Sequence, residues 1–228
     1  MITVEKSAHY YQQVYDSIRR MIIQGVWQPG ERIYEAKLAR EIGVSRSPVR
    51  ESVRALEKEG LLVLDEKSRI TVYKPNLQDV EEIYQCRMAL ESLAAKLAAR
   101  LATPQEKKEI ENVLLLTKQY LVEDEERNKL KIVELNSRFH NIVIECSRNK
   151  RLQKQLHDLR SLIYYYMTIN INGENRRWDI YNDHQAIFEC IAEGLDEKAG
   201  TVMEKHIEKD LDHLKQMDFW ARQAKNLL

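Results

Sequence analysis

The spacing of hydrophobic positions changes once along the chain, near Pro75. After this proline, apolar residues recur every three to four positions almost without interruption, which is the period of an amphipathic α-helix. Before it, helical periods alternate with turns that contain glycine or proline, and one short stretch is typical of β-structure. The pattern predicts a mainly α protein with two domains, residues 1–75 and residues 76–228.

The part before Pro75 predicts three helices and a hairpin. Gly25, Gly43 and Gly60 each follow an apolar period, and glycine commonly stands just past the C-terminus of a helix. After the last of these glycines, two short apolar runs flank a polar tip. We expect helices over 8–24, 35–43 and 47–58, and strands over 61–64 and 70–73.

The part after Pro75 predicts an all-α bundle of six helices. The strongest start signal is Thr103-Pro104-Gln105-Glu106, in which threonine caps, proline takes the first helical position and glutamate closes a capping box. We expect helices over 77–101, 104–123, 127–147, 149–171, 177–193 and 196–225.

Residues 38–61, LAREIGVSRSPVRESVRALEKEGL, hold a motif suited to DNA. Two predicted helices flank a tight turn, and the second carries Arg46, Arg50 and Arg54 on one face, opposite an apolar face. Such a helix can be held by its apolar face while the arginines enter the major groove and bond guanine. Ser45 and Ser47 stand at its start, where hydroxyl and backbone N–H groups can hold a phosphate.

An ordinary surface helix would explain the same arginines, because each could pair with Glu51 or Glu57. The combination of a short helix, a glycine turn, an arginine-rich helix and a hairpin favours a winged helix-turn-helix that binds DNA. Charge adds little, because the chain has 36 basic and 36 acidic residues. Residues 1–75 carry 13 Lys and Arg against 10 Asp and Glu, a modest excess in the expected direction.

The cysteines and the hydropathy indicate a cytoplasmic protein. Cys86, Cys146 and Cys190 are odd in number and lack the spacing of a metal motif, so we expect reduced thiols. No apolar run approaches the roughly 18 to 20 residues that span a bilayer, so a membrane is not an expected partner.

The N-terminal segment resembles the DNA-binding domain of GntR-family bacterial repressors. The resemblance implies that Arg46, Ser47 and Arg50 contact operator DNA and that a wing reaches the minor groove. The wing tip lacks the glycines usual in the family and offers Lys67 and Arg69 instead, while Ala36 replaces a basic residue that some members have. The similarity rests on Ile18, Ile22-Ile23-Gln24-Gly25, Pro29-Gly30-Glu31, Leu38-Ala39, Gly43-Val44-Ser45-Arg46-Ser47-Pro48-Val49-Arg50-Glu51, Leu56 and Glu59-Gly60-Leu61.

The six predicted helices resemble the all-helical FCD effector domain of the FadR-type branch, which often holds a metal ion. The resemblance implies a divalent metal, zinc or nickel, at Asn136, His140, His184 and His206. Family members usually have aspartate at the position of Asn136, so a neutral residue there predicts weaker metal binding, or binding completed by an anionic ligand. The matching residues are Arg87, Glu91, Asn136-Ser137-Arg138-Phe139-His140, Asp183-His184 and His206.

The residues themselves leave two alternatives open in this half. Asn136 and His140 stand four apart and point the same way on one helix, but the three histidines could also form a polar pocket of hydrogen-bond donors. Arg87 lies among apolar residues, where it could clamp a carboxylate or pair with Glu91 one turn away.

Together these observations predict a homodimeric, cytoplasmic repressor of a palindromic operator in double-stranded DNA. A small organic acid, bound with the metal, is the expected effector. One alternative is a metal-responsive regulator without an organic effector. Another is a metal-dependent hydrolase, which the absence of an H-E-x-x-H or nucleophile motif disfavours.

Overall fold

The computed structural model describes residues 5–65 and 69–217. The described residues form nine helices and three short strands, which divide into two compact units. The first unit is built from the chain before Asn76 together with Leu159–Leu162, and the second from the remainder. The predicted mainly α fold class is confirmed, and each unit is described by itself below.

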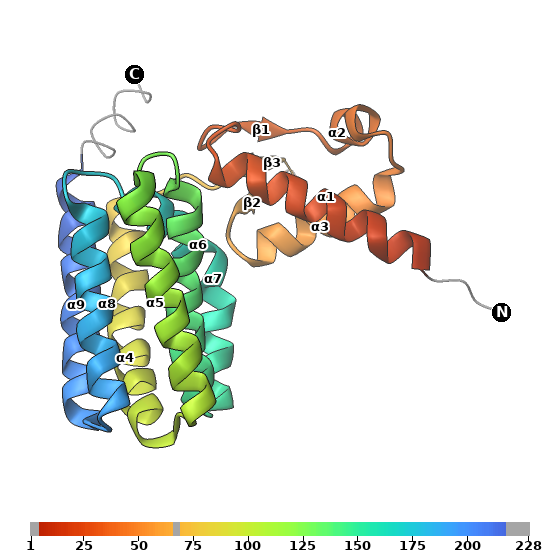
Figure 1. The fold of residues 1–228 in the computed structure, drawn as a ribbon. Helices are drawn as coiled ribbons and strands as arrows, with labels where there is room; N and C mark the ends of the chain where they lie inside the picture. Colours follow the sequence, from red (N-terminus) through yellow and green to blue (C-terminus); the bar gives the residue numbers. More distant parts are fainter. Residues whose placement is uncertain (1–4, 66–68, 218–228) are drawn as a thin grey trace. The chain divides into compact units, whose positions relative to one another are not determined.

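In the first unit, two long helices share a core. Val14, Ile18 and Ile22 of one helix and Val53 and Leu56 of the other are fully or almost fully buried where the two helices pack. The Ser52 hydroxyl fixes the pair further, because it donates to the Tyr11 carbonyl across the interface at 3.1 Å. The helices of this unit are α1 (Glu5–Ile23), α2 (Glu35–Ile42) and α3 (Arg46–Lys58), as drawn in Figure 1.

The sheet of the first unit has one more strand than the sequence predicts. β2 (Leu62–Leu64) and β3 (Ile70–Val72) form the expected hairpin, and β1 (Arg32–Ile33) adds antiparallel to β3. The strand order is β1-β3-β2, with Ile70 opposite both Ile33 and Leu64. β3, the second strand of the hairpin, is therefore the central strand of the sheet.

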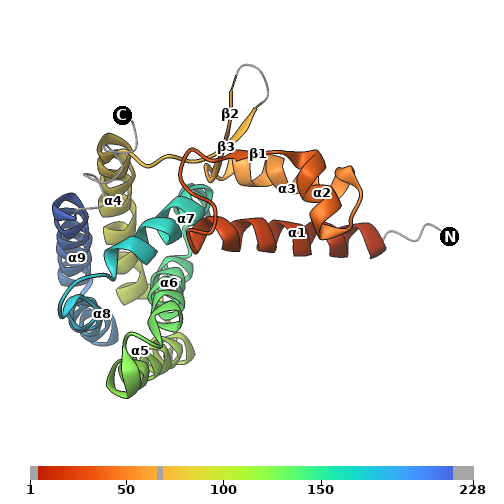
Figure 2. The same ribbon diagram turned by 90° about the horizontal axis from the view of Figure 1, so that it is seen from above.

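Within the described chain, the second unit contains five whole helices and both ends of a sixth, α7, whose residues Leu159–Leu162 belong to the first unit (Figure 1, Figure 2). α9 packs against α4 and α8, α8 also packs against α5, and α6 packs against α5 and α4, which encloses a core between the helices. The bounds are α4 (Leu77–Leu101), α5 (Pro104–Asp124), α6 (Lys129–Cys146), α7 (Lys150–Asn170), α8 (Arg176–Ala192) and α9 (Asp196–Gln216).

Local signals explain where two of these helices begin. The Asn76 side chain accepts the Asp79 N–H at the start of α4, and Thr103 and Glu106 form the predicted capping box at the start of α5. The prediction for the last helix is wrong at Met217 and untested beyond it. α9 stops at Gln216, and Met217 has extended backbone, whereas the predicted residues 218–225 lie outside the described residues.

The described helices include none that is both long enough and apolar enough to pass through a lipid bilayer.

Candidate functional site

The two faces of α3 differ in exposure as the sequence predicts. Arg46, Arg50 and Arg54 are exposed, whereas Val49 and Val53 on the opposite side are buried against the rest of the unit. α3 therefore presents a row of three guanidinium groups to solvent.

The turn before α3 leaves the N-terminus of that helix open. Gly43 takes the left-handed conformation at φ 75°, and its N–H caps α2 by donating to the Ala39 carbonyl. Ser45 follows as the N-cap of α3, but its side chain makes no capping hydrogen bond, and no acidic residue stands in the first turn. Ser47 in that turn is also exposed. The free N–H groups and the positive end of the helix dipole are thus available to an anion.

Among the described residues, the three arginines of α3 do not form the alternative ion pairs with glutamates of the same helix. Within residues 5–65 and 69–217, none of the three forms an ion pair with Glu51 or Glu57, and Arg50 instead approaches Glu35 of α2 at 3.8 Å. Both groups are partly exposed, so this pair is worth little. An open hollow of about 630 Å³ is lined by α2 and the start of α3, at Tyr34, Ala36, Lys37, Ala39, Arg40, Val44, Ser45 and Arg46.

The wing contributes one described basic residue. The Arg69 backbone N–H and guanidinium both bond to the Asp65 carboxylate at the base of the β2–β3 connection. Lys67, the second predicted wing contact, lies outside the described residues.

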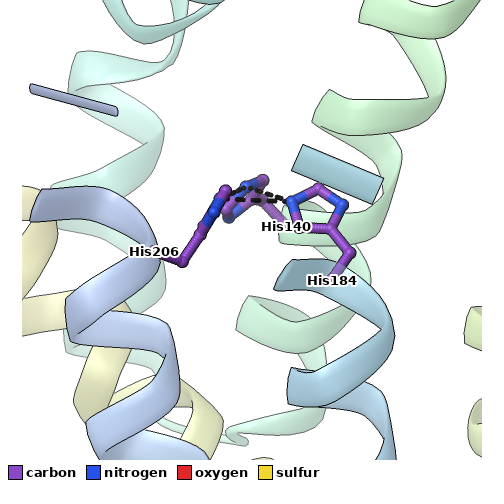
Figure 3. A group of neighbouring side chains, drawn as sticks. All are labelled: His140, His184 and His206. Carbon is purple, nitrogen blue, oxygen red and sulfur yellow. Dashed lines mark hydrogen bonds between the residues drawn. The ribbon is translucent and has the colours of Figure 1, made fainter. Parts of the chain in front are cut away.

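Inside the second unit, three predicted residues come together. His140 of α6, His184 of α8 and His206 of α9 are each at most 3% exposed, and Figure 3 shows their rings converging. The His184 Nε2 atom lies 3.2 Å from Nε2 of both other rings, and those two lie 3.4 Å apart. Three nitrogens bound to one tetrahedral zinc at about 2.0–2.1 Å would stand roughly 3.3 Å apart.

The outer contacts of the rings fix which nitrogen faces the centre. His140 Nδ1 lies 2.6 Å from Glu91 Oε2, and because an ionised carboxylate only accepts, that Nδ1 carries the proton. His206 Nδ1 faces Asp183 Oδ2 in the same way at 3.4 Å. His184 stacks on Phe139 with ring centroids 3.9 Å apart.

This arrangement fits a cation better than a set of hydrogen bonds. With the protons on Nδ1, His140 and His206 both direct an Nε2 lone pair toward the centre, so neither can donate to the other across 3.4 Å. His184 can donate to only one of them. Asn136, one turn before His140, is also buried and its Oδ1 has no hydrogen-bond partner among the described residues. A divalent ion suits such lone pairs and an unsatisfied carbonyl oxygen.

Arg87 forms the predicted pair with Glu91 and still has donors that could bind a carboxylate. It is completely buried, and its Nε donates to Glu91 Oε1 at 2.7 Å, which is the i, i+4 pair. Its Nη1 and Nη2 atoms have no hydrogen-bond partner in the described parts of the chain, and Asp210 Oδ2 approaches Nη1 only to 4.0 Å. One edge of the guanidinium is therefore fixed, and its Nη groups remain free to donate to a ligand.

A second buried ion pair lies beside it, which sequence reasoning missed. Arg176 at the start of α8 bonds to Asp210 of α9, and Asp210 Oδ2 also lies 3.9 Å from His206 Nε2. Two signals could have singled out its two members, although neither signal pairs them. Arginine is disfavoured at a helix N-terminus by the dipole, and Asp210 stands four residues after His206 on the same face.

Burial and neighbouring charges set the ionisation of the site. Burial lowers the pKa of His184 well below its usual range, and the nearby His206 and His140 lower it further. Burial also lowers the pKa of His140 against the opposing effect of Glu91. Burial alone would raise the pKa of Glu91, but Arg87 and His140 more than offset this and hold it below its usual range. The imidazoles of His140 and His184 are therefore neutral beside the ionised carboxylate of Glu91.

Comparison with protein families identifies both units. Residues 10–72 match the family described as bacterial regulatory proteins of the gntR family, and residues 82–209 match the FCD domain. The second match alone covers more than half of the chain. The gntR family is described as regulatory proteins and the relatives are transcriptional regulators rather than enzymes, so the hydrolase alternative is not retained.

Individual relatives agree with this assignment. An uncharacterized HTH-type transcriptional regulator, YdhC of Bacillus subtilis, is 35% identical over 93% of this chain and 94% of its own length. The Glc operon transcriptional activator of Escherichia coli is 24% identical, covering 85% of this chain and 84% of its own. Among solved structures, E. coli McbR/YncC has the same fold, with a TM-score of 0.74 and 22% identity over 95% of this chain and 99% of that one. The chain therefore belongs to the GntR family of bacterial transcriptional regulators, in the group that carries an FCD domain.

Proposed function

We propose that this regulator is a repressor whose affinity for operator DNA is controlled by a small carboxylate effector, bound together with a divalent metal ion inside the second unit. The triangle of three buried Nε2 atoms is the observation that carries the proposal, since its spacing suits one metal ion and its proton pattern leaves lone pairs facing one another.

The proposed metal ligands are His140, His184 and His206, with the Asn136 carbonyl oxygen as a neutral fourth. Glu91 and Asp183 support two of the rings by accepting from their Nδ1 atoms. Three imidazoles suit zinc or nickel.

The proposed effector contact is Arg87. Its two Nη groups are buried donors without hydrogen-bond partners within the described residues, and such donors are costly to leave unpaired. A planar carboxylate accepts two parallel bonds from a guanidinium, which makes a small organic acid the ligand that fits.

The proposed DNA contacts lie on α3 and the wing. Arg46, Arg50 and Arg54 are exposed along one helix face, while Ser45 and Ser47 stand at its open N-terminus. We include Lys67 and Arg69 of the wing on the resemblance alone. Two copies related by a two-fold axis would read the two halves of a palindrome, so we propose a homodimer.

A binding titration tests this proposal. An operator is first selected from random duplexes by repeated rounds of binding, and fluorescence anisotropy then follows protein bound to it. Metal-free protein, protein with Zn²⁺ or Ni²⁺, and metal-loaded protein with a panel of organic acids are compared. We expect at least one acid to release the DNA only when metal is present. Operator binding that no acid and no metal changes would contradict the proposal.

A metal-responsive regulator without an organic effector is a second candidate. The observation in its favour is the Arg87–Glu91 pair, which already gives the arginine a charged partner. In the same titration, this candidate requires metal alone to change operator affinity, with no further change on adding any acid.

Replacing Arg50 by alanine should weaken operator binding by roughly 5- to 150-fold, because one bidentate contact to a base is worth about 1–3 kcal/mol. Among the described residues, its exposed guanidinium has one ion-pair contact, the long one to Glu35. Arg151→Ala removes an arginine that is likewise exposed, from α7, and serves as the matched control. Equal affinity of both variants for the operator, measured at one salt concentration, would argue against α3 as the reading helix.

A further inference from the structure

The formal charges buried around the three histidines cancel within the protein. Arg87 is matched by Glu91, and Arg176 is matched by Asp210, all four with side chains at most 7% exposed. Asp183, which contacts His206 from its outer side, is matched by Lys209 at 2.6 Å.

The proposed ligand set adds no negative charge to this balance. The imidazoles bind a metal as neutral groups, and Asn136 offers a neutral carbonyl oxygen. A divalent ion at this place would bring two positive charges into a region that water barely reaches, since each histidine is at most 3% exposed. An uncompensated buried charge is expensive, so anionic ligands must accompany the metal ion.

Unpaired donors in the same region show where a second anionic group would be received. Beside the Nη groups of Arg87, the Tyr84 hydroxyl has no hydrogen-bond partner within the described chain, and the arginine Cζ lies 4.7 Å from the Tyr84 ring centroid. Arg87 and the histidine cluster are also close. Asp210 Oδ2 lies 4.0 Å from Arg87 Nη1 and 3.9 Å from His206 Nε2, so both groups adjoin one carboxylate oxygen, and a ligand that spans them would lie beside Asp210.

We propose that the effector of this regulator is a dianion, and specifically a short dicarboxylate, with one carboxylate for the metal ion and the other for Arg87. The inference rests on the proposed metal and effector site and adds the charge of the ligand to it. Two separated carboxylates suit two separated recognition points, and the Arg87 fork suits a planar carboxylate. A monocarboxylate would leave one positive charge unmatched.

Calorimetry on the full-length, zinc-loaded protein tests the proposal directly. The probes are malonate, succinate and glutarate, each compared with its own monoamide, in which one carboxylate becomes a neutral amide of nearly the same shape. We expect at least one dicarboxylate to bind roughly 10- to 100-fold more tightly than its monoamide, because a charged group paired with a buried partner is replaced by a neutral one. Inorganic phosphate is included as a compact anion of similar charge.

The outcomes separate this inference from the proposed function. Equal or tighter binding of the monoamides overturns the dianion while leaving a carboxylate effector intact. Phosphate binding as tightly as the preferred dicarboxylate overturns the dicarboxylate assignment. If none of the six organic acids binds the zinc-loaded protein, the short dicarboxylate is overturned, whereas the carboxylate effector is decided by the anisotropy titration with the wider panel of acids.

Asn136→Asp gives an independent test, since it supplies one negative charge beside the metal ligands. In this variant the preference for a dicarboxylate over its monoamide should fall by roughly tenfold, as the monoanion now completes the charge balance. Asn141→Asp makes the same substitution at an exposed position of α6 and should leave the preference unchanged. An unchanged preference in Asn136→Asp protein that binds zinc would overturn the charge argument.

Discussion

Replacing His184 by alanine should weaken Zn²⁺ binding by more than about 100-fold. Loss of a residue that only supports a ligand already weakens metal binding by about 10- to 100-fold, and loss of a ligand should weaken it more. His184 is the ring that lies 3.2 Å from both of the others, so its removal leaves two ligands that face each other across 3.4 Å. The metal-free protein should also lose a few kcal/mol of stability, because alanine leaves a cavity where the buried imidazole stacks on Phe139.

Thermal unfolding with and without metal measures this effect. Metal at 100 times its Kd adds about 2.7 kcal/mol to the stability of the wild-type protein, which corresponds to roughly 5–10 °C in Tm for a unit of this size. The increase should vanish in His184→Ala and persist in His157→Ala, which removes an exposed histidine from α7. A full metal-dependent increase in His184→Ala would remove the histidine cluster as the metal site.

Replacing Glu91 by glutamine should weaken metal binding by about 10- to 100-fold although Glu91 is not a ligand. The wild-type carboxylate accepts from Arg87 Nε with one oxygen and from His140 Nδ1 with the other. Glutamine has only one oxygen. If the glutamine NH₂ group faces His140 Nδ1, that ring nitrogen must accept, so the ring carries its proton on Nε2 and the lone pair needed by the metal is lost. If it faces Arg87, two donors oppose each other.

The same substitution should lower stability by several kcal/mol, since it removes the closest carboxylate from a completely buried guanidinium. Calorimetric titration with Zn²⁺ and urea unfolding of the metal-free protein measure the two effects. Glu82→Gln, the same change at an exposed position of α4, is the control and should alter neither. Wild-type zinc affinity in a destabilised Glu91→Gln protein would mean that Glu91 supports the fold without positioning His140.

Most of the fold could be predicted because its signals are local. The apolar period and the glycines that follow it placed α2 and α3 to within one residue, and Thr103 with Glu106 fixed the start of α5. The strand β1 has only two residues and owes its pairing to β3, nearly forty residues later, so no periodicity could reveal it. Met217 was predicted to be helical because neither glycine nor proline marks the end of α9 at Gln216.

The candidate site was predictable as a set of residue types but not as a set of contacts. Helical spacing placed Asn136 and His140 on one face, whereas the meeting of His140 with His184 and His206 depends on how three helices pack. Arg87 could be paired with Glu91 from the sequence, but Asp210 reaches it from α9, more than a hundred residues later. Buried ion pairs between helices leave no repeating pattern, which is why this part needed the structure.

One carboxylate, that of Glu91, touches both the arginine proposed to hold the effector and a histidine proposed to hold the metal. On that proposal the two ligands are thermodynamically linked, and each must change the affinity of the other by the same factor. A cell short of the metal would then respond to a full supply of the effector as if it were scarce. The regulator would then respond to the metal ion and the effector jointly rather than to either one alone.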